Sequence, residues 1–365
     1  MNGRLHALHA EQGQSPWLDN LQRRYLTSGH LQSLVERGVR GLTSNPTIFQ
    51  KAIQGSDDYD LEFRSLLAAG ASPEDAYWHL VLSDIRAAAD VFAPLHAAST
   101  GGDGFVSVEV DPRLARDTDG TVAAGRALRE AAARPNVMIK VPATREGLPA
   151  IRRLVAEGTN INVTLIFGLG RYAEVMEAYI AGLEDRHASG GSLEGISGVA
   201  SFFISRVDSE IDRRLEAHAE ASALSLRGRA AVAQAVLAYR LFRDTFDTGR
   251  WQALAAHGAA VQRPLWASTS TKNPAYPDTL YVDSLIGPDT VNTLPDQTLE
   301  AFDDHGTPAR TIDTDADSAR VVWDRLQALG ITADDIADTL EREGLASFVG
   351  SFEDLLRTLG DKARS

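Results

Sequence analysis

The stretch NVMIKVPAT, residues 136–144, is a short apolar segment with a single amine inside it. Val137, Ile139 and Val141 recur at every second position, which is the period of a β-strand. A strand this rich in branched aliphatic residues is typical of a parallel sheet covered by helices on its outer face. Because an unpaired buried ammonium group is costly, Lys140 requires either a partner or a chemical role.

Desolvation disfavours the charged form of a lysine, and the neutral amine is the nucleophile that condenses with a ketone to form a Schiff base. Only four of the 36 basic residues in the chain are lysines, and arginine cannot form this imine. Lys140 is therefore a candidate nucleophile. The alternative is a structural lysine that reaches the strand end or forms an ion pair.

Other strand-like runs lie on both sides of this one and alternate with helical patterns, as expected for βα units. The eight predicted strands are residues 16–19, 41–46, 105–111, 136–142, 161–167, 198–204, 264–268 and 290–294. Helical periodicity predicts helices at 72–96, 120–134 and 171–186. The long gaps at 47–104 and 205–263 each have room for two or more helices.

Eight such units predict an α/β protein with a (β/α)8 barrel of the TIM type, with extra helices in the long connections and at the C-terminus. Amphipathic helices are predicted at 317–329, 332–343 and 351–359, and residues 316–364 are expected to cover the barrel. No linker is evident, so residues 1–365 are expected to form one domain. The alternative of an open doubly wound sheet lacks its G-x-G-x-x-G loop.

Composition argues against several other classes of protein. A net charge of −14 disfavours nonspecific nucleic-acid binding, and the absence of cysteine excludes disulfides and thiolate sites. The nine histidines form no H-x-x-x-H pair, so we expect no zinc site. The polar residues 1–14 do not resemble a signal peptide, and no later run has the roughly twenty apolar residues of a membrane span. We therefore expect a cytoplasmic protein without a membrane partner.

In a parallel barrel the aliphatic face of each strand lies against the helices, so the polar face points into the barrel. In an exposed antiparallel sheet the same alternation would face water. The polar set at the ends of six successive strands comprises Asp19, Asn45, Glu109, Lys140, Asn162, Thr164 and Ser201. An amine, carboxylates, amides and hydroxyl groups around one volume suit imine chemistry on a hydroxylated substrate.

Several short motifs, in this order and spacing, resemble the transaldolase family, the class I aldolase-type enzymes of the pentose phosphate pathway. They are Trp17-Leu18-Asp19, Thr43-Ser44-Asn45-Pro46-Thr47, Val106-Ser107-Val108-Glu109-Val110-Asp111, Ile139-Lys140-Val141-Pro142-Ala143-Thr144, Asn160-Ile161-Asn162-Val163-Thr164-Leu165, and Ser201 through Arg206 followed by Asp208. The resemblance covers most of the chain. The chain length and the segment TSTKNP at 269–274 are most similar to the longer bacterial branch of the family.

The resemblance implies a transferase that needs no cofactor. It would move a dihydroxyacetone unit from sedoheptulose 7-phosphate or fructose 6-phosphate to glyceraldehyde 3-phosphate or erythrose 4-phosphate. Lys140 would form the Schiff base, and Glu109 would relay protons through a water held by Thr164. Asp19 would take the proton of the C4 hydroxyl; its alternative role is to cap a helix at 20–26.

The resemblance also implies substrate-binding residues. Asn45 and Asn162 would hydrogen-bond the dihydroxyacetone hydroxyls, and Ser201 would contribute to the same pocket. Both amides could instead satisfy backbone groups. Arg206 is expected to bind phosphate, because a guanidinium fork matches phosphate oxygens and a helix start there would add amide donors.

At the seventh strand the chain departs from the shorter members of the family. These place an arginine two residues after the serine that corresponds to Ser268, whereas Ser270 stands here. We expect Lys272 to take over the second phosphate contact, because it is one of only four lysines and lies in the same loop as Ser268. An exposed loop lysine without a role is the alternative.

Two other functions remain open at this point. A fructose 6-phosphate aldolase would share the lysine and the barrel but release free dihydroxyacetone, and Glu109 in place of a tyrosine-assisted relay favours transfer. A barrel that binds sugar phosphates without turnover would be expected to lose part of the polar set, which is complete here. The sequence is compatible with a monomer or a homodimer.

Overall fold

The computed structural model describes residues 3–218 and 221–364, which include a closed barrel of eight parallel strands. Each strand pairs with the next, and the last pairs with the first. The strands are β1 (Gln14–Leu18), β2 (Gly41–Thr43), β3 (Phe105–Glu109), β4 (Val137–Pro142), β5 (Ile161–Ile166), β6 (Gly198–Phe203), β7 (Gln262–Ala267) and β8 (Thr290–Leu294). Every predicted strand overlaps one of them, and the predicted (β/α)8 barrel is confirmed.

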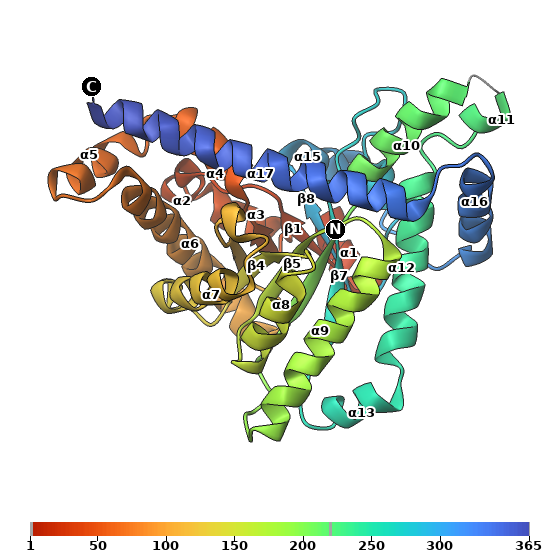
Figure 1. Cartoon of the computed structure of the whole chain (residues 1–365), viewed down its shortest axis with the longest axis horizontal. Coiled ribbons are helices and arrows are strands. Elements are labelled where there is room, and N and C mark those ends of the chain that lie inside the picture. Colours follow the sequence, from red (N-terminus) through yellow and green to blue (C-terminus); the bar gives the residue numbers. More distant parts are fainter. Residues whose placement is uncertain (1–2, 219–220, 365) are drawn as a thin grey trace.

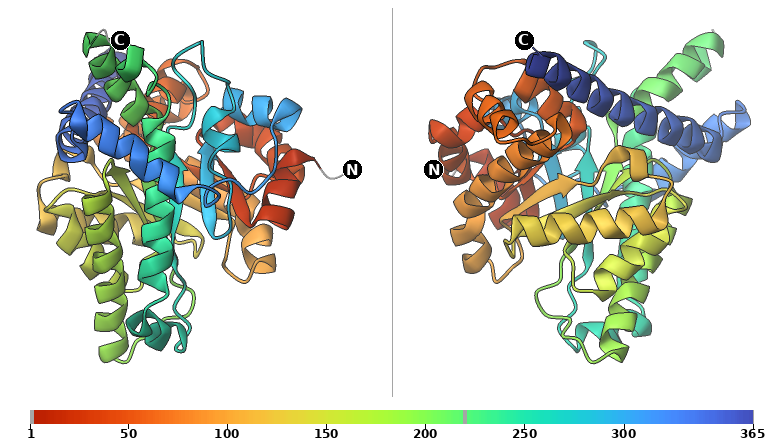
Figure 2. Two further views of the ribbon diagram at one scale, coloured as in Figure 1. Left: turned by 90° about the vertical axis from the view of Figure 1, so that its right-hand side faces the viewer. Right: turned by 60° about the vertical axis from the view of Figure 1, so that its left-hand side comes forward.

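Helices alternate with the strands and form a layer around the barrel (Figure 1, Figure 2). They are α1 (Arg4–Gln12), α2 (Arg23–Thr27), α3 (His30–Arg37), α4 (Pro46–Gln54), α5 (Asp60–Ala68), α6 (Pro73–Ala98), α7 (Thr118–Ala132), α8 (Gly147–Ala156), α9 (Leu169–Ala188), α10 (Ser205–His218), α11 (Ala221–Leu224), α12 (Ala230–Phe246), α13 (Gly249–Ala255), α14 (Leu280–Asp283), α15 (Asp296–His305), α16 (Ala316–Ala328) and α17 (Ala333–Arg364), with a 3-10 turn at Pro112–Leu114. Both long gaps contain several helices, and the three predicted helices correspond to α6, α7 and α9.

The second βα connection shows how local sequence fixes a helix start at the barrel mouth. Asn45 follows β2 and is the N-cap of α4, where its side-chain oxygen accepts a hydrogen bond from the amide of Ile48 at 2.9 Å. Pro46 occupies the first helical position, where its missing N–H costs nothing. α4 also buries Phe49 and Ile53 in the core. The helix is therefore fixed both by its capped start and by its buried face.

A buried acid ties the amino ends of several strands together. Asp103, just before β3, accepts hydrogen bonds from Ser15 at 2.9 Å, Arg40 at 2.7 Å and Arg263 at 3.1 Å. α1, which the sequence analysis did not predict, precedes β1 at this end of the barrel. This cluster of charges therefore lies at the end of the barrel opposite the carboxyl ends of the strands.

The prediction of three C-terminal helices is wrong in one respect. The segments 332–343 and 351–359 belong to the single helix α17, which runs across one end of the molecule and packs on α4, α6, α10 and β5 (Figure 1). A helix-interior glycine costs only about 1 kcal/mol, so Gly344 does not break the helix. A Cβ at Gly344 would lie 3.0 Å from a side-chain carbon of Leu165, which explains why glycine suits this close contact.

The long helices carry charged residues along their length. Within residues 3–218 and 221–364, none combines the length and the apolar character that a membrane span requires. Residues 316–364 form α16 and α17. The assignment of residues 1–365 to one domain stays a prediction.

Candidate active site

A cavity of about 340 Å³ opens at the carboxyl ends of the strands, the face at which barrel enzymes place their active sites. Seven of the ten predicted site residues line it: Asp19, Asn45, Lys140, Ser201, Arg206, Ser268 and Lys272. The other three, Glu109, Asn162 and Thr164, are buried in the strands on either side of β4. The structure therefore brings the predicted set into one region but divides it between the cavity wall and the layer next to it.

Lys140 lies in β4 between two polar residues in register, Glu109 on β3 and Asn162 on β5. Its Nζ donates a hydrogen bond to the backbone carbonyl of Ser44 at 3.1 Å and lies 3.3 Å from Oε2 of Glu109. Lys140 is 4% exposed and Glu109 5% exposed. Glu109 is therefore not a surface residue on an edge strand, because it is buried in a closed barrel that has no edge.

Burial raises the pKa of Glu109, and the nearby ammonium group of Lys140 opposes that rise. The charge of Lys140 therefore influences whether Glu109 holds a proton. Apart from the ion pair with Lys140, both carboxylate oxygens lack a hydrogen-bond partner among the described residues, and so does the hydroxyl of Thr164. Buried polar atoms of this kind are suited to bind water.

A short chain of side-chain hydrogen bonds links β6 to β3. Ser201 donates to the amide oxygen of Asn162 at 2.7 Å, and the amide nitrogen of Asn162 donates to the hydroxyl of Ser107 at 3.0 Å. These bonds fix the orientation of the Asn162 amide. Asn162 therefore forms hydrogen bonds with side chains rather than with backbone groups. Of these hydrogen-bonded residues, Ser201 is the one that reaches the cavity.

Asp19 follows β1, and its carboxylate accepts a hydrogen bond from the hydroxyl of Thr43 at 2.8 Å. Burial raises the pKa of Asp19, while the charge of Lys140 and the bond from Thr43 lower it. The nearby helix α2 begins at Arg23 with Gln22 as its N-cap. The alternative in which Asp19 caps a helix at 20–26 is therefore wrong.

Besides Lys140, three cations from separate elements line the cavity: Lys51 on α4, Arg206 in the first turn of α10 and Lys272 in the loop after β7. Arg206 stacks between two aromatic rings, 5.2 Å from the ring centre of Phe203 and 6.0 Å from that of Phe348. Among the described residues, no carboxylate forms an ion pair with any of the three cations. The helix start predicted at Arg206 is confirmed by α10.

Two of these cations lie close enough to act on the third. Burial lowers the pKa of Arg206. Burial together with the charges of Arg206 and Lys51 lowers the pKa of Lys272, which donates a hydrogen bond to Ser270 at 2.6 Å. Positive charge concentrated in one concave site of an acidic protein favours the binding of an anion.

Two residues near the site have left-handed backbone conformations that residues other than glycine rarely adopt. Leu165 has φ of 60°, beside an irregularity in the pairing of β5 with β6, and Ser268 has φ of 57°. The Ser268 hydroxyl lies 2.8 Å from that of Ser205, at the start of α10. Strained backbone of this kind is often found where a site must be held in a particular shape.

The cavity wall includes residues that were not predicted from the sequence, among them Lys51 and, on α17, Ser347 and Phe348. The rarity of lysine could have indicated Lys51. The chain has only four lysines, and three of them line this cavity. No comparable signal marks Ser347 and Phe348. Their place at the cavity depends on the packing of α17 across the barrel.

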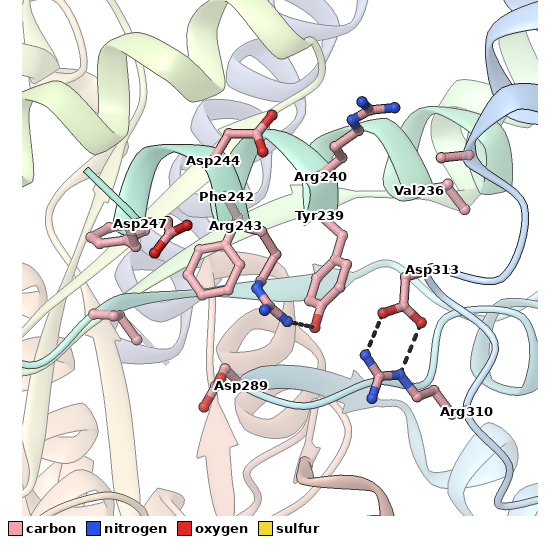
Figure 3. Close-up of a pocket in the computed structure, with 13 residues that line it drawn as sticks. Val236, Tyr239, Arg240, Phe242, Arg243, Asp244, Asp247, Asp289, Arg310 and Asp313 are labelled. Carbon is pink, nitrogen blue, oxygen red and sulfur yellow. Dashed lines mark hydrogen bonds and ion pairs between the residues drawn. The ribbon is translucent and has the colours of Figure 1, made fainter.

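A larger cavity, of about 640 Å³, lies beside α12 and near the amino ends of β7 and β8 (Figure 3). Some of its charged groups engage neighbouring side chains: Arg310 pairs with Asp313, and Arg243 donates to Tyr239 at 3.4 Å. It contains none of the predicted site residues. In the described ranges, no group of three His, Cys, Asp or Glu side chains is arranged to hold a metal ion.

A parallel barrel with a buried lysine and a cluster of cations at its carboxyl end is the class of site that suits Schiff-base chemistry on anionic carbonyl compounds. The profile of the Transaldolase/Fructose-6-phosphate aldolase family matches residues 16–359. The chain is 51% identical to the transaldolase of Thermobifida fusca over 349 residues, which are 95% of either chain. It is 50% identical to the transaldolase of Saccharopolyspora erythraea over 363 residues, covering 99% of this chain and 98% of the relative.

The chain belongs to the transaldolase/fructose-6-phosphate aldolase family. The family inferred from the short motifs is therefore confirmed, and the chain is an enzyme of the transferase class.

Proposed function

We propose that this enzyme transfers a dihydroxyacetone unit from sedoheptulose 7-phosphate or fructose 6-phosphate to glyceraldehyde 3-phosphate or erythrose 4-phosphate, through a Schiff base on Lys140. The observation that carries the proposal is the 3.3 Å separation of Lys140 from Glu109 beside a cavity lined by three cations. Relatives with the name transaldolase, about half identical over nearly the whole chain, support the same activity.

In the first half of the reaction, the neutral amine of Lys140 attacks C2 of the ketose and forms a carbinolamine. Loss of water to give the imine requires a proton on the leaving hydroxyl group. Glu109, whose pKa burial raises, is suited to supply that proton and to take one back on hydrolysis. A water between Glu109 and Thr164 would extend the reach of the carboxyl group, and the unpartnered oxygens of both residues support this arrangement.

In the second half, Asp19 takes the proton of the C4 hydroxyl, the C3–C4 bond breaks and an aldose phosphate leaves. The electron pair is held by the imine as an enamine, which then attacks the aldehyde carbon of the acceptor. Asp19 returns its proton to the new hydroxyl group. Asn45, Ser201 and Asn162 are proposed to hold the hydroxyls of the three-carbon unit, with Asn162 acting through its bond to Ser201.

The phosphate of either substrate is proposed to bind at Arg206 and Lys272, with Ser268 beside them. Arg206 has no carboxylate partner among the described residues and is held between Phe203 and Phe348, so its guanidinium group is already oriented for an anion. Lys272 would supply the second charge that the missing arginine after β7 provides in shorter family members.

The test is intact-mass spectrometry after incubation with fructose 6-phosphate and sodium borohydride, followed by peptide mapping. We expect a single three-carbon adduct on Lys140 and none in a Lys140→Met variant. A folded sample without an adduct would refute the Schiff-base proposal. Free dihydroxyacetone that accumulates without an acceptor would indicate an aldolase, which the comparisons do not favour.

We also propose a cytoplasmic location and substrates that are sugar phosphates rather than nucleic acids. The net charge of −14 supports the second point, because a nucleic-acid surface requires a basic face. Monomer and homodimer are both compatible with these proposals. Size-exclusion chromatography with light scattering would separate them.

A further inference from the structure

Among the described residues that line the cavity, Lys51 is the cation to which the proposed reaction gives no role. It lies on α4 one turn beyond Thr47, and Thr47, Ile48 and Lys51 all line the cavity. This is the spacing of one helix face. Because Phe49 and Ile53 are buried on the other side, α4 cannot turn Lys51 away without breaking its core contacts.

α4 is also held from the C-terminal side of the chain. The hydroxyl of Thr47 lies 2.8 Å from that of Ser351, and Gln54 donates to the hydroxyl of Thr358 at 2.9 Å. Both partners belong to α17, which packs along α4. Lys51 is thus a flexible side chain on a firmly placed backbone, a combination that lets an ammonium group follow a bound anion.

The electrostatic setting of Lys51 differs from that of the lysine outside the cavity. Lys362, on α17, forms an ion pair with Asp60 at 2.6 Å. Among the described residues, Lys51 and Lys272 have no such carboxylate partner, and the charge of Lys51 lowers the pKa of Lys272. Like charges that repel across a cavity are stabilised when an anion lies between them.

We propose that Lys51 is a further phosphate-binding residue, so that the substrate phosphate is bound by two lysines from different elements, Lys51 and Lys272, and by Arg206. The inference rests on the proposed function and adds a residue to it. One guanidinium fork makes two parallel bonds, whereas one ammonium group is a point charge. Two lysines from separate elements of the cavity wall can therefore contact different phosphate oxygens.

The first test measures binding of inorganic phosphate by calorimetry, which needs no turnover. The variants are Lys51→Met, Lys272→Met and the double variant, with Lys362→Met as the matched control that removes the same charge elsewhere. Each active-site variant is expected to weaken phosphate binding about tenfold, as loss of a charged hydrogen bond predicts. A Lys51→Met protein that binds phosphate like the Lys362→Met control would overturn the proposal.

The second test compares two acceptors, glyceraldehyde 3-phosphate and glyceraldehyde, at saturating donor. The ratio of their kcat/KM values is expected to fall about tenfold in Lys51→Met and to recover partly in Lys51→Arg, which restores the charge. A purely structural role of Lys51 would lower both values together and leave the ratio unchanged, which would also overturn the proposal.

Borohydride trapping separates this inference from the function on which it rests. If Lys51→Met still forms the Lys140 adduct but keeps the acceptor ratio and phosphate affinity of the unaltered enzyme, only the role of Lys51 is wrong. If the unaltered enzyme forms no adduct, the proposed function fails, while the phosphate measurement still decides whether Lys51 is part of an anion site.

Discussion

Glu109 and Lys140 occupy paired positions on neighbouring strands, and their side chains meet with 3.3 Å between Oε2 and Nζ. Both are nearly fully buried, so each loses most of its hydration. A buried ion pair is weak evidence for stability, because desolvation offsets much of the attraction. The pair is better explained by proton transfer, since burial raises the pKa of Glu109 and the amine must lose its proton to attack a ketone.

Replacing Glu109 with glutamine should slow imine formation without preventing it. The amide keeps the size of the side chain but cannot exchange a proton, so the rate of adduct formation on Lys140 is expected to fall about 10²-fold to 10³-fold. The measurement is borohydride trapping at successive times after mixing with fructose 6-phosphate. Glu157→Gln, at an ion pair with Arg126 on the surface, is the control. An unchanged trapping rate in Glu109→Gln would exclude Glu109 from proton relay.

Replacing Lys272 with alanine should raise the KM for fructose 6-phosphate about tenfold with a smaller effect on kcat. The ammonium group is expected to bind the phosphate equally in the ground state and the transition state, so its removal weakens binding more than it slows the chemistry. Steady-state kinetics at fixed acceptor concentration checks this. Lys362→Ala serves as the control, because Lys362 pairs with Asp60 outside the cavity. If Lys272→Ala leaves the KM unchanged, Lys272 is an exposed loop lysine without a role in binding.

The stability of the enzyme should depend on pH through Asp208. Its carboxylate accepts hydrogen bonds from the amide of Ala231 and the hydroxyl of Tyr281, each at 2.8 Å, and burial raises its pKa to about 6. The folded state therefore holds this proton more tightly than the unfolded state. The stabilisation is complete below the unfolded pKa of about 4 and is lost as pH rises through about 6.

Asp208→Asn removes this titration. The free energy of unfolding of the unaltered enzyme, relative to the variant, is expected to decrease by about 3 kcal/mol between pH 4 and pH 7. Urea denaturation of both proteins at a series of pH values measures it. A difference that stays constant, or that grows as the pH rises, would contradict the raised pKa.

Removing Asp103 should destabilise the fold while sparing the chemistry. Asp103→Ala leaves the guanidinium groups of Arg40 and Arg263 without their buried acid, at a cost of about 3–5 kcal/mol in the free energy of unfolding. Thermal denaturation checks the loss of stability, and borohydride trapping well below the Tm should still show the adduct. Asp185→Ala, at an exposed ion pair with Arg152, should cost no more than about 1 kcal/mol. Equal losses in the two variants would contradict the special role of Asp103.

The barrel could be predicted from sequence because its signals are local. Alternation along β3, β4 and β5 marks buried parallel strands, and Ser72 with Pro73 marks the start of α6, where the Ser72 hydroxyl accepts a hydrogen bond from the amide of Asp75 at 3.1 Å. The prediction of a break within α17 was wrong because the continuity of this helix depends on tertiary packing rather than on local sequence. Gly344 weakens a helix locally, but the packing of α17 on the barrel outweighs that cost.

The candidate site was predictable only in part. Side chains at the strand ends, such as Lys140 and Asp19, converge wherever a parallel barrel closes, so their grouping followed from the predicted fold. Lys51 and Phe348 lie on helices whose positions depend on packing against distant segments. No periodicity in their own neighbourhoods indicates that they reach the cavity.

The sequence by itself determined the order of the strands, the polar face of each and the candidate nucleophile, because strand period and side-chain chemistry are properties of short segments. Only the tertiary structure decided that Lys140 meets Glu109, that Asn162 reaches the cavity through Ser201, and that three cations surround one volume. These relations join residues far apart in the chain, and the packing of the whole barrel sets their distances.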